Sequence, residues 1–289
     1  LPKRGARRRV AAVSLFVVAT PIGNLGDLSF RAVEVLRDAD VIACEDTRVT
    51  RKLLQAHDIR TPTESFHAHS GADAVARWVG RLAEGTQVAL VTDAGTPTVS
   101  DPGAALVAAA RAADVDVRVI PGPSALTAAV AVSGLPPEPL LFLGFLPRQG
   151  RARQTRIGWL DQLPVTGVLY ESPMRLPATL RDLASALGDR PAAVTRELTK
   201  RFETVVRGTL PELAERFAEP PKGEIAVVIG PGAGRGPSSW EQVDQALQAG
   251  LSEGEPPSRL AREVARQTGR PRAAVYDRLK GMKAGNKRD

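Results

Sequence analysis

Two carboxylates, Asp93 and Asp101, lie within one loop that is rich in glycine and proline. The loop follows the apolar run 88–91 and precedes an alanine-rich stretch, 104–113, so the order is strand, loop, helix. Glycines permit close backbone approach, whereas prolines fix φ and remove donors, so the loop should be stiff and rich in free carbonyls. Such a loop suits a neutral or cationic ligand better than a phosphate. Taken alone, it is equally typical of a tight turn that binds nothing.

Four polar residues, from Glu45 to Arg48, directly follow another apolar run, 41–44. In open α/β sheets the ligand lies at the carboxyl ends of the strands, so these side chains are candidates for the same site. Helix capping by Asp46 or Thr47 is the alternative at those two positions, but it does not explain Arg48.

Further polar side chains occur at two other kinds of position. In the second half of the chain, loops hold Glu171, Arg175, Glu197, Lys200 and Glu224, so acids occur at loop positions in both halves. His67 and His69 lie on one face of an extended segment, but no clear third ligand accompanies them. Structural zinc usually takes four protein ligands, so no metal site is expected.

The elements that position these residues alternate between strand and helix up to about residue 136. A continuous apolar run at 14–19 is typical of a strand buried on both faces of a parallel sheet. Helical patterns separate it from similar runs at 41–44, 88–91 and 115–120. We therefore predict a parallel, doubly wound N-terminal α/β domain over residues 14–136.

Three prolines in 136–139 mark a hinge into a second α/β domain, predicted over 137–230. The sequence predicts five strands there, at 140–145, 165–170, 193–197, 203–207 and 225–229, and helices at 151–163, 176–187 and 211–217. The segment 193–208 leaves no room for a crossover helix between its two strands. The second sheet must therefore be mixed, with some antiparallel pairs.

The chain ends in a glycine-rich segment and a basic helical region. The segment 230–236 lacks the G-x-G-x-x-G register and the βαβ unit of a nucleotide loop, so a linker at 231–239 is expected. Ser238 and Glu241 have the spacing of a capping box, which would begin a small helical tail. In the module at 240–289, two short arginine-rich helices resemble a helix-turn-helix, which either contacts nucleic acid or serves only as a packing appendage.

Composition is ordinary for a soluble globular protein, since 43% of the 289 residues are hydrophobic and 25% are charged. The single cysteine, Cys44, lies in an apolar run, so no intrachain disulfide is possible and a cytoplasmic location is expected. No apolar stretch reaches the roughly 18 residues of a membrane span, so no membrane partner is expected.

The net charge of +7 is concentrated at the two ends of the chain. Residues 1–9 carry five basic and no acidic groups, and residues 252–289 carry ten basic and five acidic groups, which leaves 24 basic and 27 acidic groups elsewhere. This pattern favours a polyanion that the termini contact over an anionic small substrate in the centre. For the predicted basic flexible tail at 1–13, a solvated segment without function is the alternative.

Eight loop motifs follow one another along the chain: Thr20-Pro21-Ile22-Gly23-Asn24-Leu25, Glu45-Asp46-Thr47-Arg48, Asp93-Ala94-Gly95-Thr96-Pro97 with Asp101-Pro102-Gly103, Pro121-Gly122-Pro123-Ser124-Ala125, Gly144-Phe145-Leu146-Pro147, Tyr170-Glu171-Ser172-Pro173, Arg196-Glu197-Leu198-Thr199-Lys200 and Lys222-Gly223-Glu224. In this order they closely resemble the bacterial 16S ribosomal RNA cytidine 2′-O-methyltransferase family of the tetrapyrrole methylase superfamily. The match runs from about Leu15 to Ile229, and the basic tail also looks like the C-terminal module of that family.

The resemblance implies two α/β domains with S-adenosylmethionine in the cleft between them, and a homodimer. The substrate would be a cytidine ribose in the 16S ribosomal RNA of the small subunit. Met174 departs from the family pattern, which usually has a histidine there, and this weakens any mechanism that uses that imidazole. By position, the residues along the cofactor would be Pro21, Gly95, Thr96, Val99, Ser124, Ala125, Tyr170, Leu198 and Glu224.

The implied chemistry is an in-line displacement, in which a ribose 2′-hydroxyl attacks a sulfonium methyl. Positioning should supply most of the acceleration, and no metal is required. As a hypothesis, Asp93 or Glu171 accepts or orients the hydroxyl proton and Lys200 stabilises the oxyanion. The candidates for phosphate contacts, each of which could equally be a surface ion-pair partner, are Arg48, Arg51 and Arg175.

Three other functions are weighed against this one. A methyltransferase of the same architecture that acts on a corrinoid ring would need no basic tail. A non-catalytic ribosome-binding factor would use the basic ends but would not bind S-adenosylmethionine. A dehydrogenase is more distant, because no glycine fingerprint follows the first strand.

Overall fold

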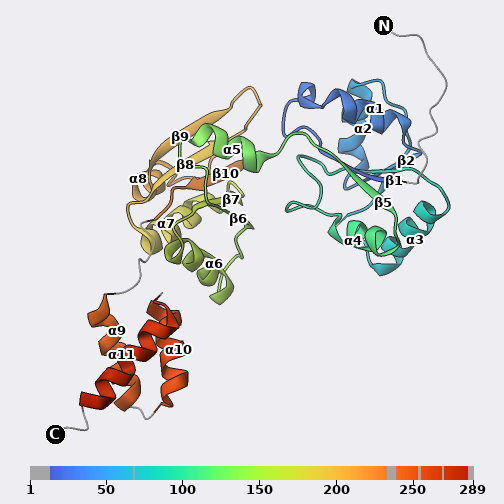
Figure 1. Cartoon of the computed structure of the whole chain (residues 1–289). Helices are drawn as coiled ribbons and strands as arrows, with labels where there is room; N and C mark the ends of the chain where they lie inside the picture. Colours follow the sequence, from blue (N-terminus) through green and yellow to red (C-terminus); the bar gives the residue numbers. More distant parts are fainter. Residues whose placement is uncertain (1–13, 68, 233–238, 253–254, 269, 286–289) are drawn as a thin grey trace.

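The computed structural model describes residues 14–67, 69–232, 239–252, 255–268 and 270–285. They form two α/β units and a three-helix C-terminal module (Figure 1). The predicted fold class, a parallel and a mixed sheet followed by a helical tail, is confirmed. The predicted basic tail at 1–13 and most of the predicted linker at 231–239 lie outside the described residues.

The first sheet is fully parallel and has the strand order β3-β2-β4-β1-β5. Its strands are β1 (Ser14–Val18), β2 (Val41–Cys44), β3 (Thr63–Ser65), β4 (Val88–Leu90) and β5 (Asp116–Ile120). Every residue of β2 and β4 is buried, as expected of strands that helices cover on both faces.

Helices of the first half cover the two faces of this sheet in pairs. One buried cluster contains residues of α1 (Phe30–Asp38) and α2 (Thr47–Ala56), and a second contains residues of α3 (Ala72–Ala83) and α4 (Ala104–Ala112). A short 3-10 helix, η1 (Leu25–Asp27), precedes α1. The Asp46 carboxylate caps α2 by accepting from the Arg48 backbone N–H, which confirms the capping interpretation.

The second sheet is mixed, with the order β6-β7-β10-β8-β9. Only β6 and β7 pair in parallel, and the other neighbours are antiparallel, as predicted for 193–208. The strands are β6 (Leu140–Phe145), β7 (Thr166–Glu171), β8 (Pro191–Arg196), β9 (Thr204–Thr209) and β10 (Ile225–Ile229). The helices packed on one face of it are α6 (Arg151–Gln162), α7 (Leu176–Leu187) and α8 (Leu210–Arg216).

The other face of the second sheet is covered by α5 (Ala125–Ser133), a helix that follows the last strand of the first sheet. Ala129 of α5 is fully buried against Val168, Ala193 and Val228. The helix therefore lies inside the predicted range of the first domain but packs on the second. The domain boundary at residue 136 stays a prediction. By chain order α5 belongs to the first domain, whereas by packing it belongs to the second.

The C-terminal module consists of α9 (Trp240–Ser252), α10 (Pro257–Thr268) and α11 (Arg272–Gly285), and its core contains residues of these helices alone. A capping box precedes α9, one residue later than the predicted pair Ser238 and Glu241. Ser239 and Gln242 exchange the two side-chain-to-backbone hydrogen bonds, and Ser238 lies outside the described residues.

The packing of α5 predicts a stability effect at Ala129. Ala129→Leu adds volume to a fully buried contact, so we expect the free energy of unfolding to fall by about 1–3 kcal/mol in chemical denaturation. Ala131→Leu, at an exposed position of the same helix, is the matched control and should change stability little. Equal stability of the two variants would show that α5 is not packed as described.

Candidate functional site

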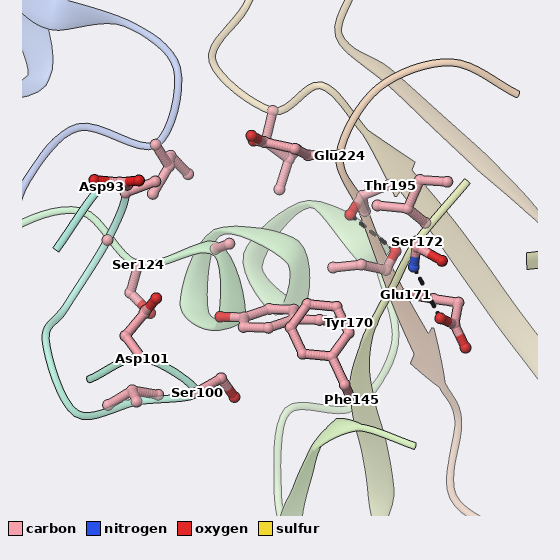
Figure 2. A pocket seen from close by; sticks show the side chains of 18 of the residues that line it. Asp93, Ser100, Asp101, Ser124, Phe145, Tyr170, Glu171, Ser172, Thr195 and Glu224 are labelled. Carbon is pink, nitrogen blue, oxygen red and sulfur yellow. Dashed lines mark hydrogen bonds between the residues drawn. The ribbon is translucent and has the colours of Figure 1, made fainter. Parts of the chain in front are cut away.

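A cavity of about 380 Å³ lies between the carboxyl edge of the first sheet and the face of the second sheet that carries α5. Loops of both sheets line it, together with the first residues of α5 (Figure 2). Asp93 and Asp101 are on its first-sheet side, and Tyr170 and Glu224 come from the second sheet. A single pocket thus collects the ends of strands that are far apart in sequence.

The loop after β4 is fixed to the loop after β1 by a pair of backbone hydrogen bonds. Thr20 and Gly95 exchange N–H to carbonyl bonds of 2.8 and 3.1 Å, and the buried Thr20 hydroxyl donates to the Thr92 carbonyl at 3.0 Å. Gly95 has φ +86°, which a glycine adopts without steric cost. The β4 loop therefore reaches the cavity as a rigid wall.

Residues with a strained backbone lie in the loops on both sides of the cavity. Thr98 and Ser100 have φ of +76° and +65° in the β4 loop, and Glu197 and Thr199 have φ of +54° and +67° between β8 and β9. Non-glycine residues with positive φ are uncommon and tend to cluster at functional sites. No sequence pattern indicates these four conformations.

Two glycines allow the sheets to approach each other across the cavity. A Cβ atom at Gly144, at a bulge in β6, would lie 3.0 Å from the Ser100 hydroxyl of the β4 loop. A Cβ at Gly23 would lie 2.5 Å from Cγ of Lys200. Each glycine therefore makes room for a side chain of the opposite half.

The cavity brings together eight of the nine positions predicted for a cofactor: Gly95, Thr96, Val99, Ser124, Ala125, Tyr170, Leu198 and Glu224. Pro21 is buried and does not line the cavity, although its neighbour Ile22 does. The role of each residue toward a ligand stays a prediction.

Asp93 fits the predicted place for a proton acceptor. It lies in the cavity wall, and its Oδ1 atom accepts from the Asp46 backbone N–H at 3.1 Å. Although the residue is exposed, burial of part of the carboxyl raises its pKa, and nearby Glu45 and Asp46 raise it further. A carboxylate with a raised pKa is a better base near neutral pH.

Glu171 has contacts of a different kind. Its side chain is completely buried, and its oxygens accept from the Thr179 hydroxyl at 2.6 Å and the Ser172 N–H at 2.8 Å. Arg175 lies 3.4 Å from the same carboxylate. In Figure 2 the group points away from Asp93 and Asp101. These contacts give Glu171 a structural role at the start of α7, and its predicted catalytic role stays untested.

Lys200 does not line the cavity but is held beside it. Its Nζ lies 3.0 Å from carboxylate oxygens of both Glu197 and Glu224. Burial acts to lower the pKa of Lys200, but hydrogen bonds to Glu224 and Glu197 outweigh it and raise that pKa. The Lys200 ammonium is thus paired with two carboxylates. In this arrangement it is not directed at the cavity, where its predicted contact with an oxyanion would have to form.

The three predicted phosphate contacts divide into two types. Arg48 and Arg51 are exposed on α2, where Arg48 pairs with Asp46 at 2.6 Å and keeps 84% of its side chain exposed. Arg175 instead donates to the Leu146 carbonyl at 2.7 Å and so ties the loop after β6 to α7. The contacts favour a structural role for Arg175, whereas the α2 arginines face solvent.

The prediction gave no role to several lining residues. Burial raises the pKa of Asp101 to about 6, and the carboxyl is near Thr92, Glu45 and Asp93. In Figure 2 the Tyr170 hydroxyl points toward Asp101. Phe145 is 50% exposed and meets Tyr170 edge-to-face at 5.7 Å. Asp101 and Phe145 lie within recognised loop motifs, but residue type alone does not reveal which way a side chain points.

The cavity therefore suits a ligand with apolar surface and positive charge. Ile22, Val99 and Leu198 offer apolar contact, while the carboxylates of Asp93 and Asp101 offer negative potential. Such a pocket can hold a nucleoside with a cationic group more readily than a phosphate.

No group of three or more His, Cys, Asp or Glu side chains among the described residues could hold a metal ion. His67 and His69 are hydrogen-bonded to each other: the His69 backbone N–H donates to Nδ1 of His67 at 3.2 Å. In the part of the chain that is described, no helix is both long and apolar enough for a bilayer crossing.

The contacts of Glu171 predict a loss of stability when its charge is removed. Glu171→Gln leaves one of the Thr179, Ser172 and Arg175 contacts unsatisfied, so we expect the free energy of unfolding to fall by about 1–3 kcal/mol. Glu219→Gln, at an exposed site, is the control and should be nearly neutral. If Glu171→Gln is as stable as the control but loses turnover, the structural interpretation is wrong and the catalytic one is restored.

The chain is similar to known proteins in sequence. Residues 14–214 match the family model described as tetrapyrrole (corrin/porphyrin) methylases. A protein of Mesorhizobium japonicum named ribosomal RNA small subunit methyltransferase I is 45% identical over 275 residues, which cover 93% of this chain and 92% of that protein. A protein of the same name from Xylella fastidiosa (strain Temecula1) is 46% identical and covers 91% and 97%.

Solved structures share the fold at lower identity. A cobalt precorrin-4 methyltransferase has a TM-score of 0.59 at 20% identity, over 78% of this chain and 98% of that one. A diphthine synthase has a TM-score of 0.61 at 18% identity, over 75% and 89%. A Thermus thermophilus uroporphyrin-III C-methyltransferase, complexed with S-adenosyl homocysteine, has a TM-score of 0.52 at 21% identity, over 76% and 97%.

Proposed function

This chain belongs to the tetrapyrrole methylase family, within the group named ribosomal RNA small subunit methyltransferase I, and we propose that it methylates small-subunit ribosomal RNA with S-adenosylmethionine. The observation that carries this is the 45% identity to a protein of that name over more than 90% of both chains. In finer terms, we propose that the acceptor is the 2′-hydroxyl of a cytidine in 16S ribosomal RNA. The proposal includes a homodimer that acts in the cytoplasm.

The residues of the cavity fit S-adenosylmethionine. The cofactor has a sulfonium cation and an amino group, and the half-buried Asp101 carboxylate is a counter-charge for one of them. Its adenosine matches the apolar side chains of Ile22, Val99 and Leu198. When bound, the cofactor supplies an electrophilic methyl group.

The chain's own contribution is to position the acceptor hydroxyl and to receive its proton. Asp93 is our candidate for that proton, because it lines the cavity and accepts only one backbone N–H among its described hydrogen bonds. Glu171 and Lys200 are left out of this mechanism, because both groups are engaged by other side chains. Most of the acceleration comes from orientation, which the rigid β4 loop maintains.

We propose that Arg48 and Arg51 contact phosphates of the RNA. Both are exposed on α2, whose N-terminal cap Asp46 is hydrogen-bonded to Asp93 in the cavity wall. The spacing between consecutive nucleotides along an RNA strand is short compared with the length of this helix. A phosphate held on α2 would therefore place the neighbouring ribose near the cavity. Such contacts position the RNA but carry no sequence information.

The deciding experiment is methyl transfer from labelled S-adenosylmethionine to small ribosomal subunits, followed by mapping of the modified nucleotide. We expect one cytidine to become resistant to alkaline cleavage at its 3′ side, as a 2′-O-methyl requires. Methylation of a base instead would support the proposed activity on ribosomal RNA but would reject the ribose 2′-hydroxyl as the acceptor. Transfer only to a corrinoid ring, or no binding of the cofactor, would reject the whole proposal.

The proposed role of Asp93 predicts a loss of turnover. Asp93→Asn should lower kcat about 10²–10⁴-fold while the Kd for S-adenosylmethionine increases far less, since the amide cannot take a proton. Asp38→Asn, exposed at the end of α1, is the control. Wild-type turnover of Asp93→Asn would exclude this carboxylate as the acceptor.

The raised pKa of Asp101 predicts pH-dependent cofactor binding. Above about pH 6 the carboxyl is ionised and attracts the cationic cofactor; below it the carboxyl is protonated and the attraction is lost. We therefore expect the Kd for S-adenosylmethionine, measured by calorimetry between pH 5 and 8, to increase as the pH falls through about 6. Asp101→Asn should bind weakly at pH 8 and lack this dependence. An unchanged pH profile in the variant would assign the effect to another group.

A further inference from the structure

Charge is unevenly distributed within the C-terminal module. The described charged residues of α9 are acidic, Glu241 and Asp244, whereas the described cations of the module all lie on or next to α10 and α11. These cations are Arg259, Arg262, Arg270, Arg272, Arg278 and Lys280. The basic character of the tail therefore belongs to the second and third helices.

Two of these arginines are part of the module's own packing. The guanidinium groups of Arg270 and Arg278 lie 4.6 and 5.0 Å from the centroid of the Trp240 ring. Arg278 also forms an ion pair with Asp244. They join α11 and the preceding turn to α9, so they do not form a surface for a partner.

Beside the packed face of α11 lies a different set, Arg272, Tyr276 and Lys280, which we call the α11 stripe. These residues are four apart, so they form one row along the helix, which borders the face where Val275 and Leu279 are buried. The side opposite the buried residues carries the exposed Asp277. Arg272 and Lys280 are exposed, and their positions are about 12 Å apart along the axis at 1.5 Å per residue.

We propose that the α11 stripe binds the phosphate backbone of double-helical RNA. Two exposed cations eight residues apart on one helix can each engage a phosphate. Tyr276 is half-buried, and the Lys280 ammonium lies 4.8 Å from its ring centroid, so the ring is no stacking platform for an unpaired base. The deep, narrow major groove of an RNA helix excludes protein side chains, so the contact is with backbone and shape.

The stripe adds a second point of attachment to the enzyme. The choice of RNA rather than another polyanion rests on the proposed function, whereas the surface itself rests on exposure and charge. A second contact on one RNA raises the effective concentration of the cavity near its target without changing the cavity. The expected signature is therefore a raised KM for small subunits with unchanged kcat.

The test compares two full-length variants with equal changes of net charge. Arg272→Gln with Lys280→Gln removes the two cations of the stripe, and Gln245→Glu with Gln248→Glu lowers the charge equally on exposed positions of α9. Binding to a fully paired RNA hairpin is measured by fluorescence anisotropy over a range of salt concentrations. We expect the stripe variant to bind roughly tenfold more weakly, and its log Kd to change with log salt by about two units less than wild type. The α9 variant should resemble wild type.

Equal affinity of the stripe variant and wild type, or equal losses in both variants, would overturn the inference. A loss confined to single-stranded RNA would also overturn it, since the proposed partner is a duplex. Calorimetry with S-adenosylmethionine confirms that the cavity is intact in each variant. Failure to methylate ribosomal RNA would reject the proposed function but leave this binding result standing, so the two failures are distinguishable.

Discussion

The distance between the two sheets is set where a glycine backbone meets a side chain of the opposite half. Gly144 meets the Ser100 hydroxyl, and Gly23 meets Lys200. A Cβ at Gly23 would overlap the Lys200 side chain, and a Cβ at Gly144 would press on the Ser100 hydroxyl, so glycine at both positions favours the close approach of the two halves. The strained residues Ser100 and Thr199 lie at or beside these same contacts. The cavity is thus bordered by close contacts between the two halves, and these contacts involve residues with a strained backbone.

The charged residues around the cavity are sorted by what they contact. The buried Glu171 carboxylate is hydrogen-bonded within a network that reaches Thr179, Arg153 and Asp182, and this network shapes the loops of the second sheet. Asp93 and Asp101 line the cavity, with pKa values raised by burial. The site therefore combines a satisfied structural acid with acids that a ligand can use, which a count of acidic residues does not distinguish.

Apolar runs predicted most of the fold because buried strands are continuous in sequence. The runs at 140–145 and 225–229 predict strands with the bounds that the structure has. β3 (Thr63–Ser65) lies at a sheet edge, with Thr63 partly exposed and the other two residues exposed, and it is too short and polar to give a pattern. Loop motifs predicted which segments surround the cavity, but the directions of Glu171 and Arg175 depend on tertiary contacts. The sequence also did not predict that α5 packs on the second sheet, since the helix is apolar on nearly every side and no single face is marked as buried.

The position of α5 couples the two halves in another way. The helix is joined to β5 by a short loop, packs on the second sheet, and lines the cavity with its first residue. Detaching it would uncover the apolar face of the second sheet and remove a cavity wall in the same event. We therefore expect residues 14–230 to unfold as one cooperative unit on heating, even though they contain two sheets, and a ligand bound between the halves to raise the melting temperature of both.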